Sequence, residues 1–351
     1  MAPHTLLLAA PRGFCAGVDR AVLIVEKALE AYGAPVHVRH EIVHNTHVVE
    51  SLRRRGAVFV EDETTVPEGS VVVFSAHGSP PEAYENSRAL GHVLIDATCP
   101  LVTKVHHEAR RYARDGKHTV LVGHEGHQEV IGTMGQAPDA ITLVETPEDV
   151  EHLDLDPDTE IAYITQTTLS MDETESVVDR LRRMFPMLEQ PKSDDICYAT
   201  QNRQDAVKVL AERCDLILVV GSDTSSNSKR LVEVSRDRGV PSHLIEDASH
   251  IDEAWLDGVG TVGLTSGASA PEELVEGVIA WFRARGALDV DTVMVVDEDV
   301  EFAMPSVLAR KLREISGQPL DDADGASEAE LSSDPADDPL SAGPLSADLP
   351  R

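Results

Sequence analysis

The stretch TLLLAAPRGFCAGVDRAVLIVEKAL, residues 5–29, contains the pattern on which the fold of the whole chain depends. It opens with a short apolar run, Thr5–Ala10, typical of a buried strand, and apolar residues then recur at helical spacing from Val18 to Leu29. Cys15 therefore falls in a strand-to-helix turn. Glycines two residues before and after it allow the backbone to approach a ligand closely. The free amides of a helix start favour an anion such as phosphate, thiolate or a thiolate-bound cluster. We expect the Cys15 thiolate to be stabilised and accessible.

The length and net charge of the chain indicate how many domains it can form and which partners are disfavoured. A chain of 351 residues can form two or three domains. The net charge of -32, from 62 acidic and 30 basic residues, argues against nucleic acid and anionic membranes as partners. No apolar run is long enough to span a bilayer, and the N-terminus lacks the basic region and cleavage site of a signal peptide. We therefore expect a cytoplasmic protein.

The end of the chain has a composition of its own. Residues 321–351 contain nine acidic residues against one arginine and few large apolar side chains. Such a segment cannot bury enough apolar surface to fold. We predict that residues 317–351 form a disordered acidic tail.

Apolar runs and helical patterns alternate along the rest of the chain, which predicts an α/β fold with mostly parallel sheets. Polar loops follow the predicted strands. They begin at His44, Ala76, Thr98, Gly123, Thr165, Gly221 and Thr265. Because ligands bind beyond the carboxyl ends of parallel strands, these loops are the expected walls of a site.

The spacing of cysteines and polar loops suggests a threefold repeat. The intervals from each cysteine to its two loops are 29 and 62 residues for Cys15 (His44, His77), 28 and 69 for Cys99 (His127, Thr168), and 29 and 72 for Cys197 (Ser226, Ser269). We predict three α/β units, 1–97, 98–195 and 196–316, the last with a C-terminal extension. If they pack in a pseudo-threefold trefoil around one axis, the three cysteines meet in a central cavity.

Three converging thiols leave several possibilities open. The four cysteines are too widely spaced for a disulfide framework in a cytosolic protein or for a local zinc motif. Cys214 does not fit the repeat and is expected to be an inert buried thiol. The other three could hold zinc with a histidine as fourth ligand, an iron-sulfur cluster, or nothing. Spacing alone does not choose between zinc and iron.

The loops also indicate a substrate and a proton donor. Imidazole, hydroxyl and amide groups suit phosphate oxygens, and the lack of a Gly-x-x-x-x-Gly-Lys loop favours a small diphosphate ester over a nucleotide. Ten of the fifteen histidines are expected to be surface or packing residues: His40, His47, His92, His106, His107, His118, His124, His152, His243 and His250. Glu129, enclosed with few counterions, is the expected general acid. The alternative is a solvated glutamate at a helix start.

Nine motifs together resemble one enzyme family. They are PRGFCAGVD at 11–19, VHN at 43–45, SAHG at 75–78, DATCPLV at 96–102, GHQEVIGTMGQ at 126–136, TQTTL at 165–169, DICYAT at 195–200, SSNS at 225–228 and GASAP at 267–271. In this order they resemble the 4-hydroxy-3-methylbut-2-enyl diphosphate reductases of the non-mevalonate isoprenoid pathway, over about residues 1–315. One departure is Gln128, where the family often has proline.

The resemblance implies a trefoil around a [4Fe-4S] cluster held by Cys15, Cys99 and Cys197, with the fourth iron open to substrate. It implies reductive dehydroxylation to isopentenyl and dimethylallyl diphosphate, with ferredoxin or flavodoxin as electron donor. Glu129 and Thr167 would be catalytic. The residues implied for the diphosphate are His44, His77, His127, Thr168, Ser225, Ser226, Asn227 and Ser269. The alternatives are a zinc-dependent hydrolase or lyase of a small phosphate ester and a non-catalytic cluster-binding regulator.

Overall fold

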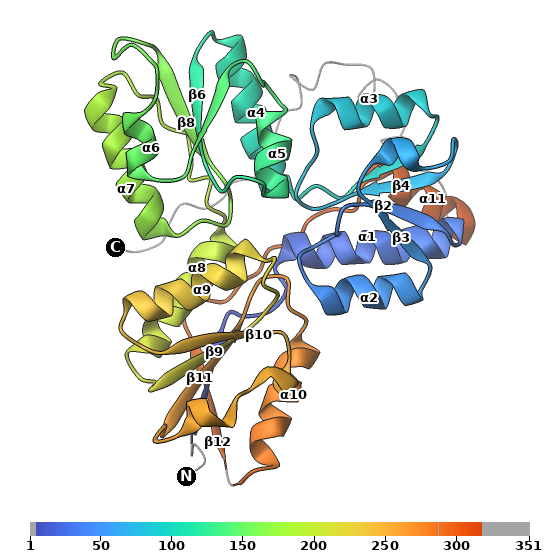
Figure 1. Ribbon diagram of the computed structural model, residues 1–351. Helices are drawn as coiled ribbons and strands as arrows, with labels where there is room; N and C mark the ends of the chain where they lie inside the picture. The colour runs from blue at the N-terminus through green and yellow to red at the C-terminus, as the bar shows by residue number, and fades with distance from the viewer. Residues whose placement is uncertain (1–4, 287, 318–351) are drawn as a thin grey trace.

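The structure is a computed structural model, and it describes residues 5–286 and 288–317. Three lobes surround a common centre, and each lobe is built on one sheet (Figure 1). Every strand pair in the three sheets is parallel. The predicted α/β class with three small parallel sheets is therefore confirmed. Of the acidic tail predicted for 317–351, all but Gly317 lies outside the described residues.

The first lobe contains a sheet of four strands in the order β3-β2-β4-β5. Its elements are α1 (Ala16–Tyr32), β2 (Val36–Arg39), α2 (Thr46–Arg54), β3 (Ala57–Val60), the 3₁₀ turn η1 (Glu63–Thr65), β4 (Val71–Phe74), α3 (Pro81–Ala89) and β5 (Val93–Asp96). Ile24 and Val25 of α1 belong to one apolar cluster with Val38 and Val73 of the sheet. This burial fixes the start of α1 against the sheet.

The second lobe contains a sheet of three strands in the order β7-β6-β8. Its elements are α4 (Pro100–Arg114), β6 (His118–Val122), α5 (Gln128–Met134), β7 (Ile141–Val144), α6 (Pro147–Glu151), β8 (Ile161–Thr165) and α7 (Met171–Met184). Val105, Ala109 and Tyr112 of α4 pack with Leu121 and Ile164 of the sheet. The helix that begins after Cys99 is therefore anchored along its buried face.

The third lobe contains the largest sheet, with five strands in the order β10-β9-β11-β1-β12. Its elements are β1 (Thr5–Ala10), α8 (Tyr198–Ala211), β9 (Leu216–Val220), α9 (Ser226–Asp237), β10 (Ser242–Ile245), η2 (Ala248–His250), η3 (Glu253–Leu256), β11 (Thr261–Ser266), α10 (Glu272–Arg283) and β12 (Asp289–Met294). Leu6 and Leu8 of β1 face one apolar cluster, and Leu7 and Ala9 face another. The apolar run at the N-terminus is thus buried on both faces of this sheet.

The two ends of the chain cross between lobes, and the predicted unit boundaries need a correction. β1, expected in unit 1–97, pairs with β11 and β12 of the third lobe. The same arrangement recurs at all three cysteines. The segment that leads to each helix-start cysteine pairs with the sheet of the preceding lobe, and the third lobe precedes the first in this cyclic order. β5, which leads to Cys99, pairs with β4, and Glu189, shortly before Cys197, bridges to Ala162.

The C-terminal extension passes from the third lobe to the first. Helix α11 (Ser306–Ser316), expected to extend the third unit, packs against α1 of the first lobe. Leu308 is buried in the apolar cluster that contains Ile24 and Val25, and Val307 and Leu312 pack at its edge. The first and third lobes therefore exchange terminal elements.

Each cysteine predicted to start a helix does so. Cys15, Cys99 and Cys197 are the N-cap residues of α1, α4 and α8, each with extended backbone angles. Cys214 is buried in an apolar cluster beside β9, as expected for an inert thiol. In the described part of the chain, no helix combines the length and apolar character needed to cross a membrane.

The docking of α11 is testable by truncating one side chain. We expect Leu308→Ala to destabilise the protein by about 2–5 kcal/mol, because it leaves a cavity between α11 and α1. Thermal or urea unfolding measures the change. Ile315→Ala, on the same helix but at a side chain that is 57% exposed, is the matched control and should cost less than about 0.5 kcal/mol. Equal losses from both variants would contradict the docking of α11.

Candidate active site

A pocket lies where the three lobes meet. Its cavity volume is about 100 Å³. Its wall contains all thirteen site residues expected from the sequence: Cys15, Cys99, Cys197, His44, His77, His127, Glu129, Thr167, Thr168, Ser225, Ser226, Asn227 and Ser269. Residues far apart in sequence are therefore gathered in one place.

Backbone hydrogen bonds place the three cysteines around this pocket. Each cysteine amide donates to a backbone carbonyl in one of the polar loops that line the pocket. The three bonds are Cys15 to Ala268 (3.2 Å), Cys99 to Ala76 (3.0 Å) and Cys197 to Thr167 (3.0 Å). The next residues in these loops are Ser269, His77 and Thr168. Each cysteine is thus held at a fixed distance from a pocket side chain of the preceding lobe.

The thiols face one another across a small gap left by a glycine. A Cβ atom on Gly17 would lie 2.7 Å from Cys99 Sγ and 3.9 Å from Cys15 Sγ, so a side chain there would collide with Cys99. Burial raises the pKa of Cys99 to about 12 and that of Cys197 to about 11, and the Cys15 thiolate adds to both shifts. At Cys99 and Cys197, burial and mutual repulsion outweigh the stabilisation offered by a helix start.

Among the residues 5–286 and 288–317, no three His, Cys, Asp or Glu side chains are grouped so that they could hold a single metal ion. Metal centres that contain several metal atoms need only one cysteine for each atom.

Three histidines form one wall. The rings of His44 and His77 are stacked with centroids 4.0 Å apart, and His127 lies 5.3 Å from His44 and 6.0 Å from His77. Burial lowers the pKa of His127 to about 3 and that of His77 well below its ordinary value, and the other imidazoles add to both shifts. His77 and His127 are therefore neutral in the empty pocket, and an anion would favour their protonated forms.

Two further walls come from helix starts and hydroxyl groups. Asn45, His127 and Ser225 are the N-cap residues of α2, α5 and α9, so three helix starts lie at the pocket. The free amides and positive dipole ends of helices bind anionic oxygens. Ser269 Oγ donates to the His44 carbonyl (2.9 Å), and Ser226 Oγ donates to the Thr168 carbonyl (3.4 Å), so these hydroxyls also join lobes.

Glu129 and Thr167 form a buried pair. The Thr167 amide donates to Glu129 Oε1 (2.6 Å), and the Thr167 hydroxyl donates to Oε2 (3.0 Å). Burial raises the pKa of Glu129 to about 7, the two Thr167 bonds oppose this shift, and Asp195 adds to it. The alternative of a solvated glutamate is wrong, since the side chain is buried. Gln128 is the first residue of α5, a position that also accepts proline, so the residue type at 128 leaves the helix start intact.

Several residues at the site were not expected from the sequence. Thr200 lines the pocket, and its hydroxyl lies 3.2 Å from Cys197 Sγ. Its position three residues after an N-cap is a signal that sequence analysis can use. His124, expected at the surface, contributes with Lys229 and Arg230 to a second cavity that shares His44, His127 and Ser226 with the central pocket.

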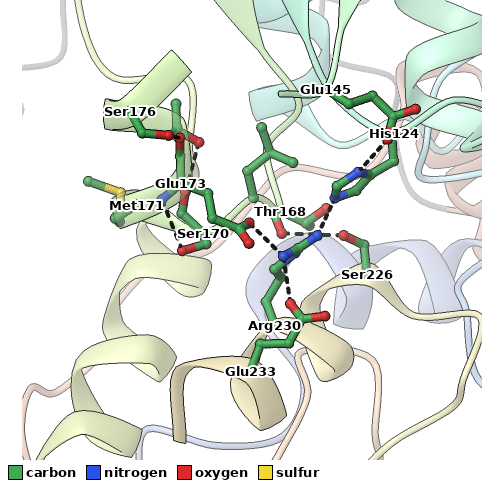
Figure 2. Close-up of polar contacts among 12 residues, drawn as sticks. His124, Glu145, Thr168, Ser170, Met171, Glu173, Ser176, Ser226, Arg230 and Glu233 are labelled. Carbon is green, nitrogen blue, oxygen red and sulfur yellow. Dashed lines mark hydrogen bonds and ion pairs between the residues drawn. The ribbon is translucent and has the colours of Figure 1, made fainter. Parts of the chain in front are cut away.

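Arg230 joins the second and third lobes beside this cavity. Figure 2 shows its guanidinium between α7 and the loop before α5. It donates to Glu173 (2.5 Å), forms an ion pair with Glu233 (2.6 Å) and contacts His124 Nε2 (2.6 Å). Arginine on a helix is usually solvated, so only the assembled lobes reveal this contact.

Comparisons with known proteins agree with the geometry. Residues 6–283 match the family model described as LytB protein. The 4-hydroxy-3-methylbut-2-enyl diphosphate reductase of Acidothermus cellulolyticus is 58% identical over 316 residues, covering 90% of this chain and 93% of that protein. The reductase of the same name from Streptomyces coelicolor is 57% identical, covering 88% and 92%.

Solved structures show the same similarity. The E-1-hydroxy-2-methyl-but-2-enyl-4-diphosphate reductase from Plasmodium falciparum superposes with a TM-score of 0.86 at 38% identity, covering 90% of this chain and 99% of that one. A second structure, of (E)-4-hydroxy-3-methyl-but-2-enyl diphosphate reductase, the terminal enzyme of the non-mevalonate pathway, gives a TM-score of 0.59 at 33% identity, covering 81% and 100%.

The Thr167–Glu129 pair predicts a pKa change that is independent of any reaction. We expect Thr167→Val to raise the pKa of Glu129 above its value of about 7, because one of two bonds that stabilise the carboxylate is lost. Infrared titration of the carboxyl stretch, with Glu129→Gln as the reference, measures it. Thr168→Val is the control, since the Thr168 hydroxyl accepts from Gln166 Nε2 instead (2.8 Å). A lower or unchanged pKa in Thr167→Val would refute the pairing.

Proposed function

Because the chain belongs to the LytB family of 4-hydroxy-3-methylbut-2-enyl diphosphate reductases, we propose that the pocket between its three lobes is the site of this reduction. The enzyme is an oxidoreductase of the terminal step of the non-mevalonate isoprenoid pathway, and its products are isopentenyl and dimethylallyl diphosphate. The relatives described above are named as reductases, which favours this reaction over a zinc-dependent hydrolase or lyase and over a non-catalytic regulator. The roles of individual residues follow from the geometry.

Cys15, Cys99 and Cys197 would hold an iron-sulfur cluster of the [4Fe-4S] type. The donor set supports this proposal, since three thiols reach one pocket from three helix starts. Cys214, the remaining cysteine, lies in the apolar core of the third lobe. When bound, such a cluster supplies electrons one at a time and an iron without a cysteine ligand that acts as a Lewis acid for the allylic hydroxyl.

The diphosphate would be bound by the histidine wall and the two other walls. His44, His77 and His127 line the same cavity as Ser226, Asn227 and Ser269. His77 and His127 are neutral when the pocket is empty, and the charge of the diphosphate would raise their pKa values again. Substrate binding would therefore be coupled to proton uptake. Thr168 and Ser225 would complete the set of donors.

Glu129 would donate the proton that allows the hydroxyl to leave as water. A pKa of about 7 keeps a large share of the carboxyl protonated near neutral pH, and general acids work best when their pKa is close to the working pH. Thr167 would aim the carboxyl, because it binds both of its oxygens. This carboxyl is the observation that carries the proton-transfer part of the proposal.

Two further points complete the proposal. The two electrons would come from ferredoxin or flavodoxin, since the sequence lacks a dinucleotide fingerprint. The enzyme would act in the cytoplasm.

Substitution of Glu129 tests its role. We expect Glu129→Gln to keep substrate affinity and to lower turnover by about 10²–10⁴-fold, the usual loss for a general acid. In the unaltered enzyme, turnover should fall as the pH rises through about 7, because the donor is the protonated form. Steady-state kinetics with a chemical reductant and direct binding measurements separate the two effects. Full turnover in Glu129→Gln would rule out the role.

Iron content tests the cysteines. Anaerobically prepared protein is expected to be brown and to hold about four irons per chain, the number in one cluster of this type. Cys15→Ser should lower the iron content, because Cys15 lies at the pocket, whereas Cys214→Ser should leave it intact. Metal analysis and the visible spectrum measure both. A colourless active protein with one zinc, or equal iron loss in both variants, would overturn the assignment.

A further inference from the structure

The three cysteine helices share a feature that the reaction does not require directly. Each carries a cation five or six residues after its cysteine, and the cation reaches across to the segment that precedes the next cysteine. Arg20 contacts the residues before Cys99, Lys104 contacts those before Cys197, and Arg203 contacts those before Cys15. The three contacts therefore close a cycle.

Arg20 of α1 holds the approach to Cys99. Its Nη1 donates to the carbonyls of Ala97 (3.3 Å) and Thr98 (3.0 Å), and its Nε donates to Ala303 (2.6 Å) in the segment before α11. Burial lowers the pKa of Arg20, and the charges of Asp96 and Cys99 oppose that shift. The guanidinium thus binds the carbonyls of the two residues that directly precede Cys99.

Lys104 of α4 holds the approach to Cys197. Its Nζ donates to the carbonyls of Ser193 (2.8 Å) and Asp194 (2.9 Å) and to Oδ1 of Asp195 (3.0 Å). The other oxygen of this buried carboxylate accepts from the Thr165 amide (3.0 Å). The segment before Cys197 is therefore fixed to both α4 and the end of β8.

Arg203 of α8 holds the approach to Cys15 and is fully buried, with 0% of its surface exposed. Its Nε and Nη2 donate to the Gly13 carbonyl (3.3 and 2.8 Å), and its Nη1 pairs with Glu298 (3.0 Å). Glu298 compensates the buried charge, while the Gly13 carbonyl lies two residues before Cys15.

We propose that Arg20, Lys104 and Arg203 form a closed ring of positioning residues, in which each cation fixes the cysteine of the next helix in the cycle Cys15, Cys99, Cys197. A charged donor binds a carbonyl more strongly than a neutral one, so each segment has little freedom to withdraw its cysteine. This inference rests on the proposed role of the cysteines as cluster ligands.

The cyclic order makes the proposal directional. Loss of a cation is expected to loosen the next cysteine in the cycle rather than the cysteine at the start of its own helix. A purely structural role for each cation would disturb its own lobe first, because most contacts of a helix lie within its lobe. The identity of the affected cysteine therefore distinguishes the two roles.

Site-resolved thiol labelling tests this order. Cluster-loaded protein is treated anaerobically with iodoacetamide and an iron chelator, and peptide mass spectrometry follows each cysteine. We expect about tenfold faster labelling of Cys99 in Arg20→Gln, of Cys197 in Lys104→Gln and of Cys15 in Arg203→Lys. The lysine variant keeps the buried charge and loses the fork that holds the Gly13 carbonyl.

Matched controls lie on the same helices. Lys27→Gln on α1 and Lys208→Gln on α8 remove cations that pair with Glu30 and Asp205 on their own helices, and they should leave all three labelling rates unchanged. Faster labelling of the cysteine on the substituted helix, or of all three equally, would overturn the ring. If Arg203→Lys does not fold, the labelling rates in Arg20→Gln and Lys104→Gln test the ring. If the unaltered protein binds no iron, the proposed cluster is wrong, but the ring can still be tested. The relative labelling rates of the three cysteines can be measured in the iron-free variants as well.

Discussion

Three hydrogen bonds donated by the amides of Cys15, Cys99 and Cys197 hold the lobes around one pocket. Each bond joins the start of one lobe's helix to the strand-end loop of the lobe before it, so the pocket wall and the cysteines cannot move independently. The bond from Cys15 to Ala268 exists only because β1 lies in the third sheet beside β11. That pairing places Cys15 beside the loop that follows β11, where its amide can bind the Ala268 carbonyl.

Burial gives the pocket a second common property. It shifts Cys99, Cys197, His77, His127 and Glu129 toward their neutral forms, through raised pKa values for the acids and lowered ones for the imidazoles. A site with neutral groups, three helix starts and nearby cations is poised to accept negative charge. Neither a strong local cation nor a phosphate loop is needed, because many weak donors converge on the same space.

The sequence reveals much of the site, because strand-end loops and helix-start cysteines depend on local patterns. The regular intervals after Cys15, Cys99 and Cys197 were enough to predict that distant loops converge. The position of β1 was missed because strand pairing is a long-range property. β5, which leads to Cys99, pairs within the lobe that precedes Cys99. The same rule applied to Cys15 places β1 in the third lobe. Arg20, Lys104 and Arg203 were missed because a cation on a helix looks like a surface residue until the neighbouring lobe is in place.

The pairing of β1 with β11 and β12 also determines when the third sheet can form during synthesis of the chain. Thr5–Ala10 is synthesised well before Thr261–Ser266 and Asp289–Met294, the two strands beside it in the sheet. Domains fold as they emerge, so the second lobe can form while the apolar N-terminal strand still lacks its neighbours. A group that binds all three cysteines would therefore depend on a sheet that is complete only after Met294 has been made. Until then, the first strand is the part of the nascent chain that most needs a chaperone, because an unpaired apolar strand is prone to aggregation.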